Sequence, residues 1–260
     1  MSFEIKKAAV LGAGVMGANI AAHLTNAGIE CYLLDIIPFE LTEDDKKKGL
    51  TEKSPAWRNR FAANGLAGAT KSKPASFYAK SNASMVTIGN FEDNLNMLAD
   101  CDWVCEVVIE NLKVKQELFA KVEKVVKPTC IVSTNTSGLP IKDISAKFSK
   151  DLKKRFLGTH FFNPPRYMKL MEIIPGVETD KAVTDFMVKF SEEVLGKGVV
   201  VCKDVPNFIG NRVGVYDLSN AGRVMVEKGM SVEEVDAIVG KVVGRPCTAV
   251  FGTMDLVGLD

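Results

Sequence analysis

The sequence has 260 residues, of which 47% are hydrophobic and 25% are charged, the proportions of an ordinary globular protein. They exclude an intrinsically disordered chain, a collagen-like repeat and a disulfide-rich miniprotein. The 33 lysines and arginines balance 32 aspartates and glutamates, and this net charge of +1 predicts no nucleic-acid partner. No membrane span, signal peptide or transit peptide is recognisable, so we expect a cytoplasmic protein without membrane contacts.

The six cysteines are scattered through mostly apolar runs, and without an export signal we expect them to be buried and reduced. Cys101 and Cys105 form the only close pair. A zinc site would need two further ligands nearby, and the sequence has two histidines in all, so we expect no metal.

Short apolar runs alternate with longer amphipathic ones along most of the chain, a pattern typical of βαβ units and a parallel sheet. The expected strands are residues 8–11, 31–34, 85–89, 103–108, 130–134, 156–162, 170–174 and 198–201. Helical patterns cover residues 17–27, which end before Gly28, and residues 114–126, which end before Pro128. Residues 38–83 are too long for a plain loop, so we expect helices and a mobile tip there.

The last part of the chain has a different pattern, with two consecutive helices and no strand between them. These helices are expected over residues 204–227 and 231–239. The change of pattern divides the chain into an α/β domain, residues 1–203, and the beginning of an all-helical domain, residues 204–260.

The strongest local motif is the glycine-rich turn at residues 12–17, which follows an expected strand and precedes an expected helix. Its first glycine permits a tight turn, the second lets the backbone approach a pyrophosphate, and the third lets the helix pack on the strand. The next strand ends at Asp35, whose carboxylate would bind a ribose diol and repel a 2′-phosphate. This context predicts a Rossmann-type, doubly wound sheet that binds NAD, with a turn that binds no ligand as the alternative. The expected cofactor contacts are Gly12, Gly14, Val15, Met16, Gly17 and Asp35.

The two histidines have different settings. His23 lies within a helical pattern, where a packed or half-exposed side chain is the simpler interpretation. His160 lies at the end of an expected strand, a place where α/β enzymes carry their chemistry. If its strand pairs with the strand of Glu172, the carboxylate could fix the ring tautomer and leave the other nitrogen as a base. By spacing alone, an unrelated strand-edge histidine and a surface carboxylate explain these residues equally well.

Two polar clusters lie at the ends of predicted elements. Residues 133–137 are five hydroxyl or amide side chains in succession, which suit hydrogen bonding to a ligand, although capping and turn formation explain them better when taken alone. Asn207 and Asn211 are expected one turn apart on the same face of the helix that begins at residue 204, from where they could point toward a cleft.

Taken together, these segments resemble the 3-hydroxyacyl-CoA dehydrogenase family. The motifs occur in family order and span almost the whole chain. They are the Gly12–Gly17 turn with Asp35, the segment Glu106-Val107-Val108-Ile109-Glu110-Asn111-Leu112-Lys113-Val114-Lys115, Ser133–Ser137, His160-Phe161-Phe162-Asn163-Pro164 with Glu172, residues 203–212, and Asp255-Leu256-Val257-Gly258-Leu259-Asp260. The block that begins at His160 is far more specific than the glycine motif.

The resemblance implies an enzyme that oxidises a (3S)-3-hydroxyacyl-CoA to a 3-oxoacyl-CoA, with hydride transfer to NAD, as in fatty-acid β-oxidation. It implies that His160 is the catalytic base and that Glu172 orients it. Ser137 and Asn211 would bind the oxygen on C3 of the substrate. The contacts implied on the nicotinamide-ribose side of the NAD site are Glu110, Lys115 and Asn163.

The sequence departs from the family in two places. Residues 38–83, where the family carries a helical excursion that helps to bind CoA, are unusually long, and Lys71 and Lys73 are the candidates for contacts with the CoA phosphates. Residues 244–251 replace a common family stretch, as in a bacterial subgroup whose dehydrogenase precedes an enoyl-CoA hydratase-like part. We therefore expect this chain to be the N-terminal part of a longer protein, which forms a homodimer when its helical domain is complete.

Two other functions stay open. One is a non-catalytic NAD-binding or structural relative of the same fold, and the intact His160, Glu172, Ser137 and Asn211 argue against it. The other is a dehydrogenase of free small 3-hydroxy acids. Such enzymes commonly use a lysine in place of the histidine at this motif, so the motif discriminates against them.

Overall fold

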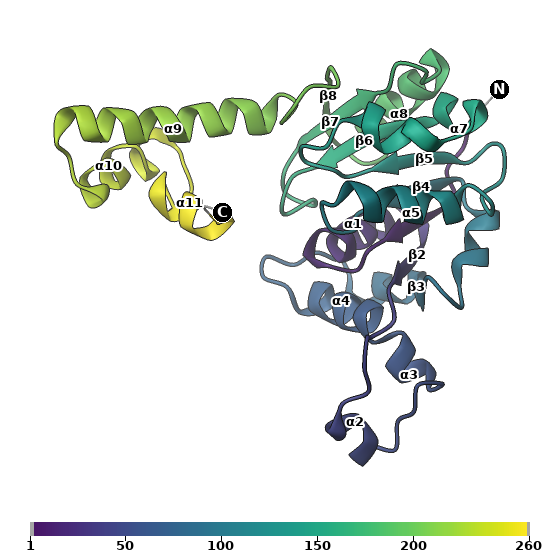
Figure 1. Cartoon of the computed structure of the whole chain (residues 1–260). Helices are drawn as coiled ribbons and strands as arrows, with labels where there is room; N and C mark the ends of the chain where they lie inside the picture. Colours follow the sequence, from purple (N-terminus) through teal and green to yellow (C-terminus); the bar gives the residue numbers. More distant parts are fainter. Residues whose placement is uncertain (1–2, 259–260) are drawn as a thin grey trace. The chain divides into compact units, whose positions relative to one another are not determined.

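The computed structural model describes residues 3–258. The chain forms two compact units, Met1–Phe208 and Ile209–Asp260, of which the first contains a sheet and the second is helical (Figure 1). The expected α/β fold followed by a helical domain is therefore confirmed. The predicted domain boundary, after residue 203, lies in the connection between the last strand and the first helix of the second unit.

Within the first unit, one eight-stranded sheet has the strand order β3-β2-β1-β4-β5-β6-β7-β8. The strands are β1 (Lys7–Leu11), β2 (Glu30–Asp35), β3 (Val86–Asn90), β4 (Trp103–Glu106), β5 (Ile131–Thr134), β6 (Phe156–Phe161), β7 (Leu170–Pro175) and β8 (Gly198–Val201). Neighbouring strands are parallel except for β6 and β7, which are antiparallel. The first six strands follow the order of doubly wound dinucleotide-binding folds, whose ligand lies at the carboxyl ends where the order reverses. That reversal lies between β1 and β4.

Helices cover both faces of the sheet (Figure 1). One face carries α1 (Val15–Asn26), α4 (Arg60–Lys71) and α8 (Lys181–Glu193), and the other carries α5 (Leu112–Val122), α6 (Ile141–Ile144) and α7 (Lys150–Lys154). Each layer of helices buries its own cluster of apolar side chains, with Leu24 and Met187 in one cluster and Phe119 and Leu152 in the other. All residues of β6 are buried, as expected for a strand covered on both faces.

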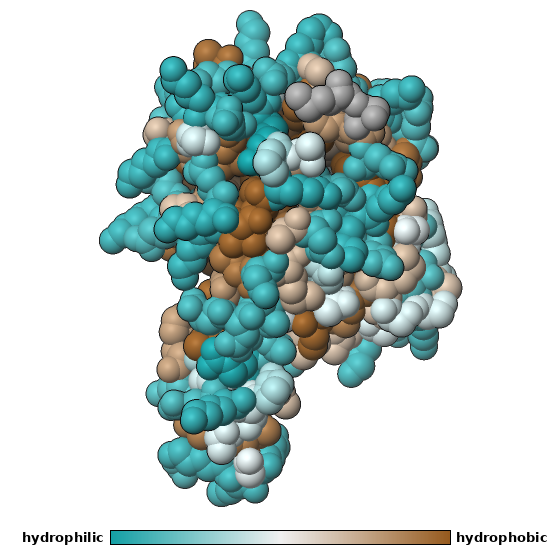
Figure 2. Space-filling view, turned by 90° about the vertical axis from the view of Figure 1, so that its right-hand side faces the viewer, coloured by the Kyte–Doolittle hydropathy of each residue, from teal (hydrophilic) through white to brown (hydrophobic). Residues whose placement is uncertain are grey.

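The long connection between β2 and β3 is helical, as expected, and reaches away from the sheet (Figure 1). Besides α4 it contains α2 (Glu43–Lys47), α3 (Pro55–Arg58) and the 3₁₀ helix η1 (Lys80–Met85). Ion pairs join Arg60 to Asp45 within it, and Arg58 to Asp93 of the following turn at 2.5 Å. Figure 2 shows one side of the molecule, which is mostly hydrophilic with a strip of hydrophobic residues near its centre.

The prediction that a helix begins at residue 204 is wrong. Helix α9 spans Gly210–Lys228. Asn207 and Phe208, just before it, have φ angles of 62° and 45°, and such left-handed backbone cannot belong to a right-handed helix. Asn207 and Asn211 therefore do not share a helix face.

As far as the structure describes it, the second unit consists of one long helix and three short helical elements. They are α9, α10 (Val232–Ile238), the 3₁₀ helix η4 (Lys241–Val243) and α11 (Phe251–Val257). Asp236 of α10 accepts hydrogen bonds from the backbone N–H groups of residues 250–252, at the positive end of α11.

Cys247 is exposed, so the expectation of six buried cysteines is wrong for this one. Among the described residues, no helix has both the length and the apolar character to cross a membrane.

The turn between β1 and α1 depends on two of its glycines. A Cβ added to Gly12, whose φ is 106°, would lie 2.5 Å from the carbonyl oxygen of Val107. A Cβ added to Gly17 would lie 1.8 Å from the carbonyl oxygen of Gly12. A Cβ added to Gly14 would meet no atom within 4 Å. Gly12 and Gly17 therefore allow strand, turn and helix to approach closely, whereas Gly14 faces open space.

We expect Gly17→Ala to lower the free energy of unfolding by about 1–3 kcal/mol, because the added methyl group displaces packed backbone. Gly14→Ala is the matched control and should change stability by less than about 0.5 kcal/mol. Urea unfolding followed by circular dichroism measures both values. Equal stability of the two variants would contradict the packing role given to Gly17.

Candidate active site

His160 and Glu172 lie directly opposite each other in the antiparallel pair β6–β7. Opposite residues of such a pair present their side chains on the same face of the sheet. His160 Nδ1 lies 2.7 Å from Glu172 Oε2, and the two residues are 4% and 0% exposed. The structure thus brings together two residues whose relation the spacing left open, and the carboxylate is not on the surface.

The surroundings hold this pair in one geometry. The thiol of Cys202 donates to the other oxygen of Glu172, with Sγ 3.5 Å from Oε1. The rings of Phe162 and Phe208 lie against the imidazole, with centroids 4.6 Å and 5.8 Å from that of His160. A carboxylate bound to Nδ1–H selects the tautomer in which Nε2 is the basic nitrogen.

A second polar cluster lies at the carboxyl ends of β4 and β5. Lys115 of α5 is buried, and its Nζ donates to Glu106 Oε1 at 2.7 Å and to the carbonyl oxygen of Val108 at 3.2 Å. The hydroxyl of Thr134 donates to Glu106 Oε2 at 2.6 Å. Burial raises the pKa of the Glu106 carboxyl, while the charge of Lys115 and the hydrogen bonds oppose that rise.

Glu110 connects this cluster to the loop after β5. Its Oε2 pairs with Lys115 Nζ at 3.3 Å, and its Oε1 accepts hydrogen bonds from the Thr136 hydroxyl and from the N–H groups of residues 137–139. Burial by itself would raise the pKa of Glu110, but the Thr136 hydroxyl, the Lys115 charge and the N–H groups hold it below its usual value. Glu110 is therefore an ionised anchor that shapes the loop containing Ser137.

The glycine-rich turn borders a cavity of about 530 Å³ whose other walls are mostly apolar. Asp35 stands at its edge, with Oδ2 accepting the N–H of Ala13 and Oδ1 that of Ile36, each at 2.7 Å. The N-cap residue of α1 is Gly14, which has no side chain that could accept a hydrogen bond from the first turn. The N–H groups of that turn and the positive end of the helix are therefore available to an anion. An apolar cavity, a fixed carboxylate and an open helix end fit the adenosine and pyrophosphate parts of a dinucleotide.

The other residues predicted for the site lie in several places. Val15 and Met16 lie in the first turn of α1, directly after Gly14, which lines the cavity. Ser137 and Asn163 are both exposed, the first after β5 and the second after β6. Asn211 lies in the first turn of α9, in the second unit. The contacts of these five residues with cofactor or substrate stay predictions.

Comparisons with known proteins settle the family. The NAD binding domain of 3-hydroxyacyl-CoA dehydrogenases matches residues 7–205, and the C-terminal domain of these enzymes matches residues 208–260. The chain belongs to the 3-hydroxyacyl-CoA dehydrogenase family. The resemblance seen in the sequence is thereby confirmed, and NAD is confirmed as the cofactor of the first domain.

Individual relatives agree with this assignment. A Bacillus subtilis protein named "Probable 3-hydroxyacyl-CoA dehydrogenase" is 51% identical over 100% of this chain and 33% of its own length. A Deinococcus radiodurans protein of the same name is 48% identical over 99% of this chain and 70% of its own length. The crystal structure of (S)-3-hydroxybutyryl-CoA dehydrogenase from Ralstonia eutropha has a TM-score of 0.75 and 26% identity, and the match covers 99% of this chain and 84% of that one. The chain thus spans about a third of the Bacillus relative.

Glu106 and Cys202 belong to the site without having been predicted for it. A glutamate at the end of a buried strand is a signal that could have identified Glu106, because a buried carboxylate requires a partner. No comparable signal exists for Cys202. Its thiol reaches Glu172 because β8 pairs in parallel with β7 and Cys202 continues that ladder, donating its N–H to the carbonyl oxygen of Ile173.

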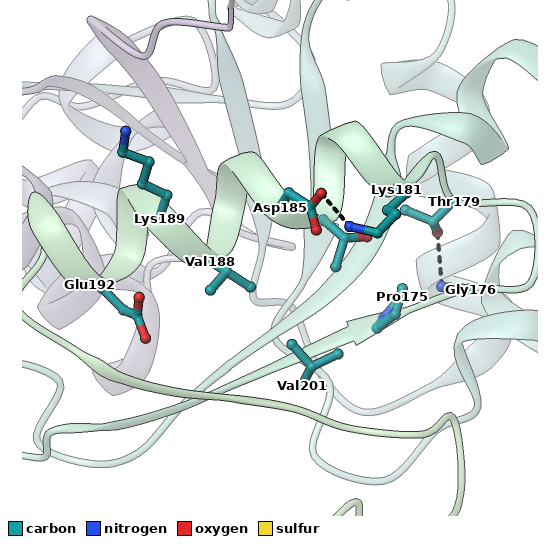
Figure 3. Close-up of a pocket in the computed structure, with 10 residues that line it drawn as sticks. Pro175, Gly176, Thr179, Lys181, Asp185, Val188, Lys189, Glu192 and Val201 are labelled. Atoms are coloured by element: carbon teal, nitrogen blue, oxygen red, sulfur yellow. Dashed lines mark hydrogen bonds and ion pairs between the residues drawn. The ribbon is translucent and has the colours of Figure 1, made fainter.

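A second cavity, of about 600 Å³, lies between α8 and the strands β7 and β8 (Figure 3). The ion pair of Lys181 with Asp185 and the hydrogen bond from the Gly176 N–H to the Thr179 hydroxyl lie on its border. Its lining residues fall between positions 175 and 201, and none of them was predicted for the site. We therefore assign this cavity no part in the candidate active site.

His23 is packed inside the protein, as its helical setting suggested, with Nε2 3.2 Å from the carbonyl oxygen of Leu195. Burial lowers the pKa of His23 to about 4.

The unfolded chain binds a proton on His23 more tightly than the folded protein does. The free energy of unfolding should therefore fall by up to about 3 kcal/mol as the pH falls from about 6.5 to about 4. His23→Gln cannot titrate and keeps an N–H donor, so its unfolding free energy should vary less over this range. An unchanged pH dependence in urea unfolding would contradict the assignment.

We expect Lys115→Met to lower the free energy of unfolding by about 3–5 kcal/mol, because it leaves the Glu106 carboxyl buried without its cation. Lys113→Met, on the exposed side of the same helix, is the matched control and should cost less than about 0.5 kcal/mol. Adding Glu106→Gln to Lys115→Met should restore part of the loss. Chemical unfolding of the four proteins measures these differences, and equal losses for the two lysine variants would rule out a buried pair.

Proposed function

We propose that the protein containing this chain oxidises a (3S)-3-hydroxyacyl-CoA to a 3-oxoacyl-CoA with NAD, as in fatty-acid β-oxidation. The buried His160–Glu172 pair is the observation that carries the proposal, because alcohol oxidation needs a base for the hydroxyl proton. Membership of the 3-hydroxyacyl-CoA dehydrogenase family supports the substrate class. The Ralstonia eutropha neighbour, named for an (S)-3-hydroxyacyl substrate, supports the stereochemistry.

The pair divides the work of proton removal. His160 Nε2 takes the hydroxyl proton of the substrate, and the imidazole becomes a cation. Glu172, already bonded to Nδ1–H, fixes the orientation of the ring and stabilises that positive charge. Bound NAD would supply the acceptor for the hydride on C3. The loss of one proton and one hydride converts the hydroxyl group into the ketone.

The remaining assignments concern binding. Ser137 and Asn211 hydrogen-bond the oxygen on C3, and Asn163 contacts the nicotinamide side of NAD. Lys115 is buried between two carboxylates, so we assign it an indirect part in NAD binding, in which it pairs with Oε2 of Glu110 and holds that side chain. The acyl-CoA is the substrate partner, and we propose a homodimer for the complete protein.

We expect His160→Gln to lower kcat/KM by at least about 10²-fold, the usual contribution of a positioned base. Glu172→Gln should also lower kcat strongly, because an amide cannot stabilise the imidazolium charge. Both variants should bind NAD as the unchanged protein does, since neither residue borders the cavity at the glycine turn. NADH absorbance with 3-hydroxyacyl-CoA substrates measures the rates, and fluorescence titration measures NAD binding.

The sequence offers a matched control in its other histidine. His23→Gln alters a packed helical residue and should leave most of the turnover intact. If the complete unchanged protein formed no NADH from any 3-hydroxyacyl-CoA, the proposed reaction would be wrong. If Glu172→Gln lost its affinity for NAD, the role of Glu172 as the partner of His160 would be contradicted.

A further inference from the structure

The connection between β6 and β7, residues 162–169, closes the hairpin that carries His160 and Glu172. Five opposite residue pairs hold the hairpin together, and the pair of His160 with Glu172 is the second from this connection. Phe161 and Met171 form the pair between. A change in the conformation of residues 162–169 therefore reaches His160 through a single intervening pair.

Lys197, in the turn between α8 and β8, holds this connection from the interior of the protein. Its side chain is buried, and its Nζ donates to the carbonyl oxygens of Pro165 and Met168, the second at 3.0 Å. The same Nζ lies 5.6 Å from the ring centroid of Phe161. Lys197 thus touches the connection at two points and the strand residue next to His160 at a third.

A second set of contacts holds the connection as well. Arg166 donates to the carbonyl oxygens of Ala75 and Phe77, at 2.7 Å and 3.0 Å. The hydroxyl of Tyr167 donates to the same oxygen of Ala75 at 3.0 Å. Residues 162–169 are therefore held both by Lys197 and by the segment that precedes β3.

Stability does not explain a lysine at this place. A buried ammonium group is costly unless a carboxylate pairs with it. No carboxylate in the described part of the chain forms an ion pair with Lys197, and burial lowers its pKa to about 8. The ionisable groups that share this region are His23, held neutral by burial, and Arg166, a second cation. Neither offsets the charge of Lys197.

We propose that Lys197 is a positioning residue for the reaction, and this inference rests on the proposed function. By holding the carbonyl groups of Pro165 and Met168, Lys197 sets the conformation of residues 162–169. That conformation places His160 and Asn163 for substrate and cofactor. Lys197 acts through this connection and through Phe161. The cost in stability of burying its charge is tolerated because Lys197 maintains the geometry of the site.

Lys197→Met in the complete protein tests the proposal, because it keeps the length of the side chain and removes its charge and donors. We expect kcat to fall about 10- to 100-fold, the effect of a small displacement at the reacting centre. The backbone amides of residues 163–169 should exchange hydrogen faster. The thermal midpoint should stay the same or rise, because a buried charge is lost. Lys197→Arg keeps the charge and the donors and should recover part of the rate and of the protection.

Lys127→Met is the matched control. Lys127 donates to Asp102 and to the carbonyl oxygen of Asp100, at the amino ends of the strands and away from the connection. Its replacement should change neither the exchange of residues 163–169 nor kcat.

Unchanged turnover and unchanged exchange in Lys197→Met would overturn the inference. A fall in kcat with a lower thermal midpoint and no faster exchange of residues 163–169 would also overturn it, because general destabilisation then explains the loss. If the unchanged protein oxidises no 3-hydroxyacyl-CoA, the proposed function fails by itself. Hydrogen exchange needs no turnover, so it then decides alone whether Lys197 positions this connection.

Discussion

A shift of β7 by one residue against β6 would turn Glu172 to the opposite face of the sheet and leave His160 without its carboxylate. The pairing of His160 with Glu172 therefore depends on one antiparallel register within a sheet whose other neighbouring pairs of strands are all parallel. Two features reinforce that register. The pairing of β8 with β7 places the thiol of Cys202 against Glu172 Oε1, the oxygen that does not contact His160. Lys197 holds the connection that joins β6 to β7.

Parallel strands explain why the other polar groups gather at one edge. The glycine turn follows β1, Glu106 ends β4, and the hydroxyl-rich loop follows β5, so all three come to the carboxyl ends of adjacent strands. The edge lies where the strand order reverses. Glu172 reaches it only because β7 runs in the opposite direction and places the beginning of the strand beside the end of β6.

The first domain contains two buried lysines whose charges have different partners. Lys115 lies between the carboxylates of Glu106 and Glu110, and this arrangement satisfies its charge. Lys197 has carbonyl oxygens as its partners, so its burial weakens the charged form. The first arrangement builds a rigid support beneath the loop of Ser137. The second arrangement lowers stability, because it buries a charge that pairs with no carboxylate of the described residues, and it does so next to the pair that performs the proposed chemistry. Proteins tolerate such a loss of stability at functional sites.

Local patterns in the sequence determined the α/β class, the strand at residues 198–201, the glycine turn and Asp35, because periodicity and turn chemistry act over short distances. Only the tertiary structure decided that His160 meets Glu172, since spacing fits a surface carboxylate equally well. It also decided the beginning of α9, because no local pattern predicted the left-handed backbone at Asn207 and Phe208. Lys115, Cys202 and Lys197 owe their positions to contacts between elements far apart in the sequence, and no local pattern records which face of a strand or helix will meet which partner.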